Sequence, residues 1–219
     1  MPSEAFPGGE PSRPIRSWVR SSPGTHIWLL IIALTSVIVA LSSDGFESAL
    51  LHRNSSNLHQ LAHHPVRALL GSAFWIEDPS DLVLYALLFE VFHAQVERWI
   101  GTLRWLLTVA GAHIAATLIS QQVVLEAIQD HDVPRSMAHV VDIGVSYGIA
   151  ASMGILTYRL PWPWRGVYLA GVVAFFAVPL CTNHTYTDLG HAISLVIGLA
   201  CWPLTRGNSV AAPHGVPSD

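Results

Sequence analysis

Six apolar stretches of membrane-spanning length dominate this sequence and constrain its fold more than any other feature. A helix rises about 1.5 Å per residue and crosses a hydrocarbon core in about 20 residues, a length that each stretch approaches. The chain has 219 residues, 51% of them hydrophobic and 12% charged, with a mean hydropathy of +0.43. We therefore predict an all-α membrane protein, a bundle of six transmembrane helices within residues 26–204. The predicted spans are 26–42, 82–98, 103–120, 139–157, 166–182 and 188–204.

The arginine residues predict the orientation of this bundle, because cytoplasmic loops of membrane proteins retain positive charge. All eleven basic residues are arginine. With six spans and both termini in the cytoplasm, eight of them lie on the inner side, and the outer loops hold Arg53, Arg67 and Arg135. The absence of lysine is typical of a GC-rich genome and favours a bacterial plasma membrane.

The two ends of the chain are predicted to be disordered cytoplasmic tails. Residues 1–25 and 205–219 are rich in Pro, Ser and Gly and contain few large apolar side chains. One alternative concerns the first apolar stretch, which an Arg-bearing leader precedes and which ends in Ala40-Leu41-Ser42, as in a signal peptide. Its removal would leave five spans and disagree with the arginine pattern, so we keep it in the bundle.

Polar residues inside the apolar stretches are the candidate functional groups, since ionisable side chains are costly in hydrocarbon. Three stretches that run from the outer to the inner side each carry an acid near the start and a hydroxyl or imidazole one turn later. We expect these side chains to converge near the outer surface. The pairs are Asp81 with Tyr85, Asp142 with Ser146, and Asp188 with His191.

Rows of small residues predict that the fourth and sixth helices pack closely. Gly144, Gly148 and Ser152 recur every four positions in one helix, and Ser194 and Gly198 lie on the same face as His191 in the other. Such a thin face allows Ser146 and His191 to approach to about 3 Å, the distance at which an imidazole takes a hydroxyl proton.

These residues, in this order, resemble the rhomboid family of intramembrane serine proteases over about residues 66–204. The resemblance rests on Gly144-Val145-Ser146, on His191 followed by Gly198, on Leu69-Leu70-Gly71-Ser72-Ala73-Phe74 and on the run from Glu97 to Arg104. It implies that Ser146 is the nucleophile and that His191 is the general base. Proteases of this family need no cofactor, and the resemblance implies none here.

Several positions depart from the family pattern. Tyr147 follows the serine where the family usually has glycine, and Asp81 and Tyr85 occupy the positions of a His and an Asn that help to bind the oxyanion. A tyrosine hydroxyl can donate to an oxyanion, whereas an ionised Asp81 would repel it. We expect the oxyanion or supporting residues to be Tyr85, Asp81, Tyr147, Asp188 and Asp142. A second hypothesis is therefore a non-catalytic rhomboid-like protein that binds transmembrane helices as an adaptor or quality-control factor.

Other polar groups allow further interpretations. A zinc hydrolase could use nitrogen and oxygen ligands near the outer surface, namely His139, His184, His191, Asp81, Asp142 and Asp188. Glu90, His93 and His113 could form a proton path or a buried hydrogen-bonded cluster. The sequence from Glu97 to Arg104 is predicted to brace a loop.

The expected partners follow from the two main hypotheses. We expect contact with the lipid bilayer and with a transmembrane helix of a substrate or client protein. We expect no nucleic acid, no metal and no cofactor.

Overall fold

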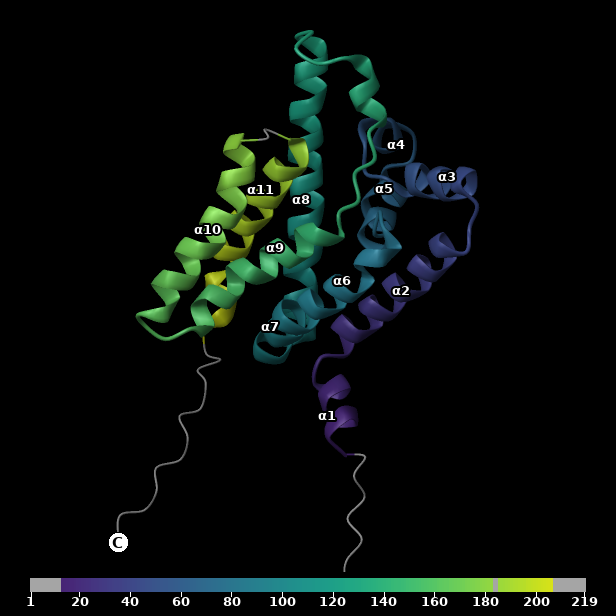
Figure 1. Cartoon of the computed structure of the whole chain (residues 1–219). Helices are drawn as coiled ribbons and strands as arrows, with labels where there is room; N and C mark the ends of the chain where they lie inside the picture. Colours follow the sequence, from purple (N-terminus) through teal and green to yellow (C-terminus); the bar gives the residue numbers. More distant parts are fainter. Residues whose placement is uncertain (1–12, 183–184, 207–219) are drawn as a thin grey trace, which may run out of the picture.

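The computed structural model describes residues 13–182 and 185–206, and the described part of the chain is helical with no strand. Its long helices are the predicted ones (Figure 1). The helices are α1 (Arg13–Ser21), α2 (Pro23–Ala40), α3 (Asp44–Asn54), α4 (Leu58–His63), α5 (Pro65–Gly71), α6 (Leu82–Leu88), α7 (Ala94–Ile100), α8 (Thr102–Gln129), α9 (Val145–Leu156), α10 (Trp164–Thr182) and α11 (Tyr186–Ala200).

Within the described residues, three helices are long and apolar enough to cross a membrane by length and composition. These are α2, α8 and α10, with 18, 28 and 19 residues. Each of the other predicted windows also contains helix, but in shorter pieces. A π-helical turn over Phe89–His93 joins α6 to α7, and α9 and α11 have 12 and 15 residues.

The outside of the bundle is apolar, as the bilayer requires. Large hydrophobic side chains are exposed on α2, α6, α8 and α10, and examples are Leu30, Val83, Leu107 and Phe175. A water-soluble protein rarely exposes so continuous an apolar surface. Together with the three long apolar helices, this surface identifies a helical protein in contact with lipid.

The short helix α9 lies at the centre of the bundle, between α8, α11 and the α6–α7 segment (Figure 1). Its close approach to α11, predicted from the small residues, is confirmed. A Cβ on Gly198 would collide with the backbone oxygen of Ala151, and one on Gly154 would lie 2.7 Å from the oxygen of Leu195. The backbones of α9 and α11 therefore touch, because neither glycine has a side chain.

The prediction of a helix from residue 139 is wrong for its first turn and a half. Residues 140–144 are extended or irregular, and α9 begins only at Val145. The reason is that Asp142 bonds to the distant segment between α3 and α4 instead of to a helix. Its N–H donates to the hydroxyl of Ser55 at 2.9 Å, and its C=O accepts from the N–H of Ser56 at 2.9 Å. Asp142 and Ser146 are therefore not neighbours on one helix face.

The predicted N-terminal tail also needs correction. Residues 13–25 form α1 and the start of α2, and residues 1–12 and 207–219 lie outside the described part. The indole of Trp18 on α1 donates to Glu90 at 2.9 Å and stacks on the guanidinium of Arg98 at 3.5 Å. These contacts give α1 a fixed place against the bundle.

Glu97 braces the end of the bundle that carries α1. Its buried carboxylate accepts from the backbone N–H groups of Gly24 and Thr25 at 2.8 and 2.7 Å. The hydroxyls of Thr25 and Thr102 add bonds of 2.6 and 2.8 Å. The carboxylate thus caps unpaired N–H groups at the start of α2. Its negative charge also interacts favourably with the positive end of the helix dipole. The predicted brace is confirmed at Glu97.

Candidate active site

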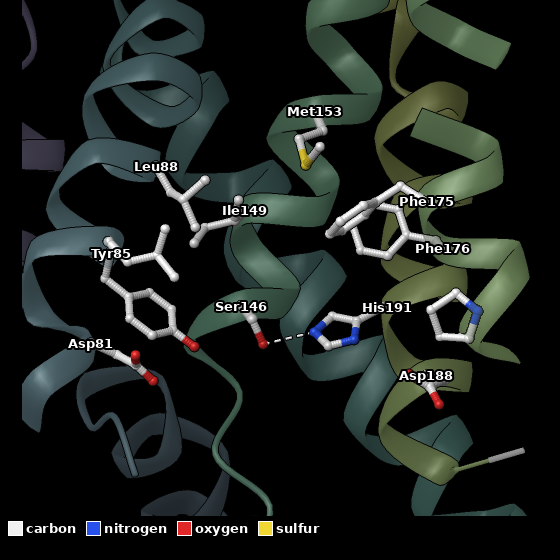
Figure 2. A pocket seen from close by; sticks show the side chains of 12 residues that line it. Asp81, Tyr85, Leu88, Ser146, Ile149, Met153, Phe175, Phe176, Asp188 and His191 are labelled. Carbon is white, nitrogen blue, oxygen red and sulfur yellow. Dashed lines mark hydrogen bonds between the residues drawn. The ribbon is translucent and has the colours of Figure 1, made fainter. Parts of the chain in front are cut away.

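Ser146 and His191 lie in hydrogen-bond contact near the starts of their helices. The Oγ of Ser146 in α9 and the Nε2 of His191 in α11 are 2.7 Å apart (Figure 2). Both residues are partly buried. The contact arises because the glycine-bearing faces of α9 and α11 bring the two backbones together further along both helices, where Gly198 meets Ala151. This distance suits transfer of the hydroxyl proton to the imidazole.

The pair opens onto an apolar cavity of about 340 Å³ between α6, α9, α10 and α11. Figure 2 shows α6 on one side of this cavity and the imidazole of His191 on the other. Its lining includes Leu84, Leu88, Met153 and Phe175.

A second cavity of about 240 Å³ meets the same pair and is lined with more polar groups. The two cavities share Asp81, Tyr85, Ser146 and His191. The lining of the second cavity also includes Glu77, Asp142 and Thr187. The Ser146 hydroxyl therefore lies between an apolar space and a polar one.

Asp81 and Tyr85 stand across the cavity from His191. Asp81 is exposed at the start of α6, and the hydroxyl of Tyr85 is directed toward Ser146 in Figure 2. The ring of Tyr85 packs against the core cluster that contains Phe89 and Ile149. Tyr85 thus has a packed ring and a hydroxyl that faces Ser146.

Tyr147 lies behind His191 and does not separate it from Ser146. The ring is fully buried and meets the imidazole edge to face, with centroids 5.2 Å apart at 74°. Its hydroxyl donates to Oδ1 of Asp142 at 3.1 Å. A Cβ on Gly190 would lie 2.6 Å from this ring, so a glycine is required there. On its other side, the imidazole packs against Phe176 of α10, with centroids 5.6 Å apart.

Asp188 lines the cavity, but its carboxylate is bonded to Thr185, the N-cap of α11. Its carboxylate accepts from the hydroxyl of Thr185 at 2.5 Å, and its own N–H donates to the Thr185 Oγ1 at 3.1 Å. Thr185 is thus the N-cap of α11, and its hydroxyl also ties up the Asp188 carboxylate. Figure 2 shows the carboxylate turned away from His191.

Two acidic residues before α6 differ in their surroundings. Partial desolvation of the carboxyl group, and secondly the charge of Asp142, raise the pKa of Glu77 above its usual value. The backbone N–H of Ser80, and secondly its hydroxyl, lower the pKa of Asp78. Asp78 therefore caps the turn that leads into α6, and Glu77 holds a proton more readily beside the polar cavity.

The remaining predicted clusters are divided among separate places. His93 bonds to Ser152 and Trp105, His113 bonds to the backbone oxygens of Leu69 and Gly144, and Glu90 pairs with His26 at 3.0 Å. The three predicted members therefore do not share one cluster. Among the described residues no group of three His, Cys, Asp or Glu side chains is suited to a metal, and His184 lies outside them.

The sequence interpretation missed three contributors to this site. Phe176 covers one face of the imidazole, while Gln121 and Ser56 hold Asp142. Phe176 gives no signal in the sequence, because it resembles any lipid-facing aromatic. The polar Gln121 follows directly on the predicted third span, and its place in a continuing helix could have been noticed.

A comparison with protein families decides the relationship. The sequence model of the family described as rhomboid-like protein matches residues 17–211, nearly the whole chain. The chain belongs to the rhomboid-like protein family. Searches of curated proteins and of solved structures give no match. Family membership covers every helix described above from α2 to α11, and it does not by itself distinguish a protease from a binding protein.

Proposed function

We propose that this rhomboid-like protein is an intramembrane serine protease that cleaves transmembrane substrates near the outer membrane surface. The observation that carries the proposal is the 2.7 Å contact between Ser146 Oγ and His191 Nε2 at the edge of an open cavity. We propose further that six helical segments cross the plasma membrane of a bacterium, with both termini in the cytoplasm. The eight inner arginines support this orientation.

The reaction would begin at the Ser146 hydroxyl. Its oxygen forms a bond to the carbonyl carbon of a substrate peptide while Nε2 of His191 takes the proton. The imidazolium then gives this proton to the leaving nitrogen as the C–N bond breaks, which leaves an acyl group on Ser146. A water oxygen then bonds to the acyl carbon while His191 takes one of the water protons. As the ester bond to Ser146 breaks, the imidazolium returns this proton to the Ser146 oxygen, and the acyl group leaves as a carboxylic acid.

Negative charge on the carbonyl oxygen needs donors near Ser146. α9 begins at Val145, so the N–H of Ser146 lies in the first turn, where helix N–H groups lack intrahelical acceptors. The positive end of the α9 dipole acts in the same place. The hydroxyl of Tyr85 is the second donor that we assign. Asp81 is exposed at the rim, where water weakens its repulsion of the oxyanion.

The second candidate is a non-catalytic protein that binds transmembrane helices. The acidic Asp81 opposite the nucleophile favours it, because such a charge opposes oxyanion formation. Tyr147 provides the argument against it. A binding protein with the dyad blocked would have Tyr147 between Ser146 and His191, but the ring lies behind the imidazole.

Labelling with a fluorophosphonate tests the proposal, because this probe reacts with activated serine hydroxyls. The Ser146→Ala variant should lose all labelling in bilayers or micelles. Ser152→Ala is the matched control, since Ser152 lies on the same helix and also bonds to a histidine. Labelling that survives Ser146→Ala would overturn the assignment. A wild-type protein that takes no label but retains bound transmembrane helices would favour the second candidate.

A further inference from the structure

His191 receives no direct support from a carboxylate among the described residues. Asp188, one turn earlier in α11, is bonded to Thr185. The orientation of the imidazole is instead set by its Nε2 contact with Ser146 and by two aromatic rings, Tyr147 and Phe176. A base held by ring packing depends on how firmly those rings are themselves held.

Tyr147 is the more firmly held of the two rings. It is 0% exposed, whereas Phe176 is 8% exposed, and its hydroxyl has a defined acceptor in Asp142 at 3.1 Å. A buried tyrosine hydroxyl needs such a partner, and the bond fixes the ring along its long axis. The absence of a side chain on Gly190 lets this ring reach the imidazole.

Asp142 is anchored by three different parts of the chain. Its Oδ2 accepts from the Ser56 hydroxyl at 3.1 Å and from the Gln121 amide at 3.1 Å, while Oδ1 accepts from Tyr147. Its backbone bonds to Ser55 and Ser56 as described above. With 7% of its surface exposed, this carboxyl group is buried and held by three donors. The three donors hold the carboxylate in a single geometry, although the Oε1 atom of Gln121 on the other side of the amide has no partner among the described residues.

We propose that Asp142 is a positioning residue for the reaction, which acts on His191 through Tyr147. The carboxylate holds the Tyr147 hydroxyl, the ring edge of Tyr147 holds the imidazole, and the imidazole therefore keeps Nε2 on the Ser146 oxygen. Asp142 therefore does not contact His191 directly, because Tyr147 lies between the carboxylate and the imidazole. The α3–α4 connection, through Ser55 and Ser56, becomes part of the support of the active site.

This inference rests on the proposed function, and a double-mutant cycle on the fluorophosphonate labelling rate tests it. Tyr147→Phe keeps the ring but removes the bond to Asp142. We expect it to slow labelling about tenfold in the otherwise unchanged protein and less than about twofold when Asp142→Ala is already present. Equal effects in the two backgrounds, or no effect in the unchanged protein, would overturn the positioning role. Rates are expressed per folded protein, with folding checked by thermal unfolding in micelles.

Rescue by a conservative variant separates positioning from general stability. Asp142→Asn keeps an oxygen that accepts from Tyr147, so its labelling rate should stay within about threefold of the unchanged protein. A loss as large as that of Asp142→Ala would contradict the inference. If Asp142→Ala does not fold, Tyr147→Phe is compared with Tyr168→Phe. The hydroxyl of the native Tyr168 donates to the Met153 backbone oxygen, away from the dyad. Similar rates for these two variants would also overturn it.

The outcomes distinguish the inference from the function on which it rests. If the unchanged protein is not labelled at Ser146, both fail. If Ser146 is labelled and the two mutations act independently, the protease assignment stands and the positioning role of Asp142 is rejected.

Discussion

Helix α9 carries two serine–histidine hydrogen bonds of nearly equal length, but the two pairs differ in burial and in the other partners of the histidine. Ser146 and His191 are 2.7 Å apart, and Ser152 and His93 are 2.9 Å apart. The second pair is 0% exposed, enclosed by the rings of Trp28, Phe89 and Trp105. The first pair borders a cavity of about 340 Å³. The comparison teaches that a short contact does not make a nucleophile unless a carbonyl group can reach it.

The histidine nitrogens differ as well. The indole of Trp105 donates to Nδ1 of His93 at 3.1 Å, the same nitrogen that contacts Ser152. An indole N–H is a donor only, so it occupies the lone pair that Ser152 would need for proton transfer. At the first pair, Nε2 of His191 faces the Ser146 hydroxyl. We therefore assign a structural role to the Ser152 pair and a chemical role to the Ser146 pair.

The largest expected effect comes from removing each histidine in turn. His191→Ala should lower the fluorophosphonate labelling rate by about 10²–10⁴, the usual contribution of a general base. His93→Ala should instead destabilise the fold by about 2–4 kcal/mol, because it leaves a buried cavity and an unpaired Trp105 N–H. Labelling per folded molecule and the thermal midpoint in micelles measure the two effects. Labelling lost equally in both variants would contradict the comparison.

A smaller effect is expected from the hydroxyl that faces the open pair. Tyr85→Phe keeps the packed ring and removes one oxyanion donor, so labelling should fall about tenfold to 10²-fold. Tyr158→Phe is the control, because the Tyr158 hydroxyl donates to the backbone oxygen of Leu199, outside the cavity. Labelling kinetics at saturating probe measure both. If the two variants label equally fast, Tyr85 is not a donor to the oxyanion.

The smallest expected effects come from adding a methyl group to glycines of the helices near the two serine–histidine pairs. A Cβ in Gly198→Ala meets the backbone of Ala151, which cannot move aside, so α9 and α11 must separate at a cost of about 1–3 kcal/mol. Gly148→Ala meets the ring tip of Trp28 at 2.8 Å, and it should cost less because a side chain can shift. Gly171→Ala, with nothing within 4 Å, should raise the thermal midpoint slightly, because alanine is the better residue in a helix interior. The reverse order would show that the α9–α11 contact is not the tighter one.

Much of the fold could be predicted from the sequence, because apolar stretches of the right length and rows of small residues are local patterns. The approach of Gly198 to Ala151 follows from such a row. The helix start at Val145 could not be predicted, since Asp142 bonds to two residues far away in the sequence. These are Ser55, which lies 87 residues earlier, and Ser56, which lies 86 residues earlier. No local pattern reports a contact between segments so far apart in the sequence.

The candidate site divides in the same way. His191 could be selected because an imidazole inside an apolar helix is costly, and Ser146 because it lies at a matching depth and in the Gly-x-Ser pattern that resembles the rhomboid family. The capping role of Thr185 could also be predicted, since a threonine directly before an apolar helix is a preferred N-cap residue. The packing of Tyr147 and Phe176 on His191 depends on how three helices rotate about their axes, which the sequence pattern does not determine.

The most direct measurement is the mass-spectrometric location of the fluorophosphonate adduct on the full chain in lipid bilayers. Our account predicts a single adduct on the peptide that contains Ser146, with Ser152 unmodified although it has its own histidine. An adduct on Ser152, or a folded protein that remains unmodified at Ser146 after prolonged exposure to the probe, would contradict the claim that Ser146 is an activated nucleophile.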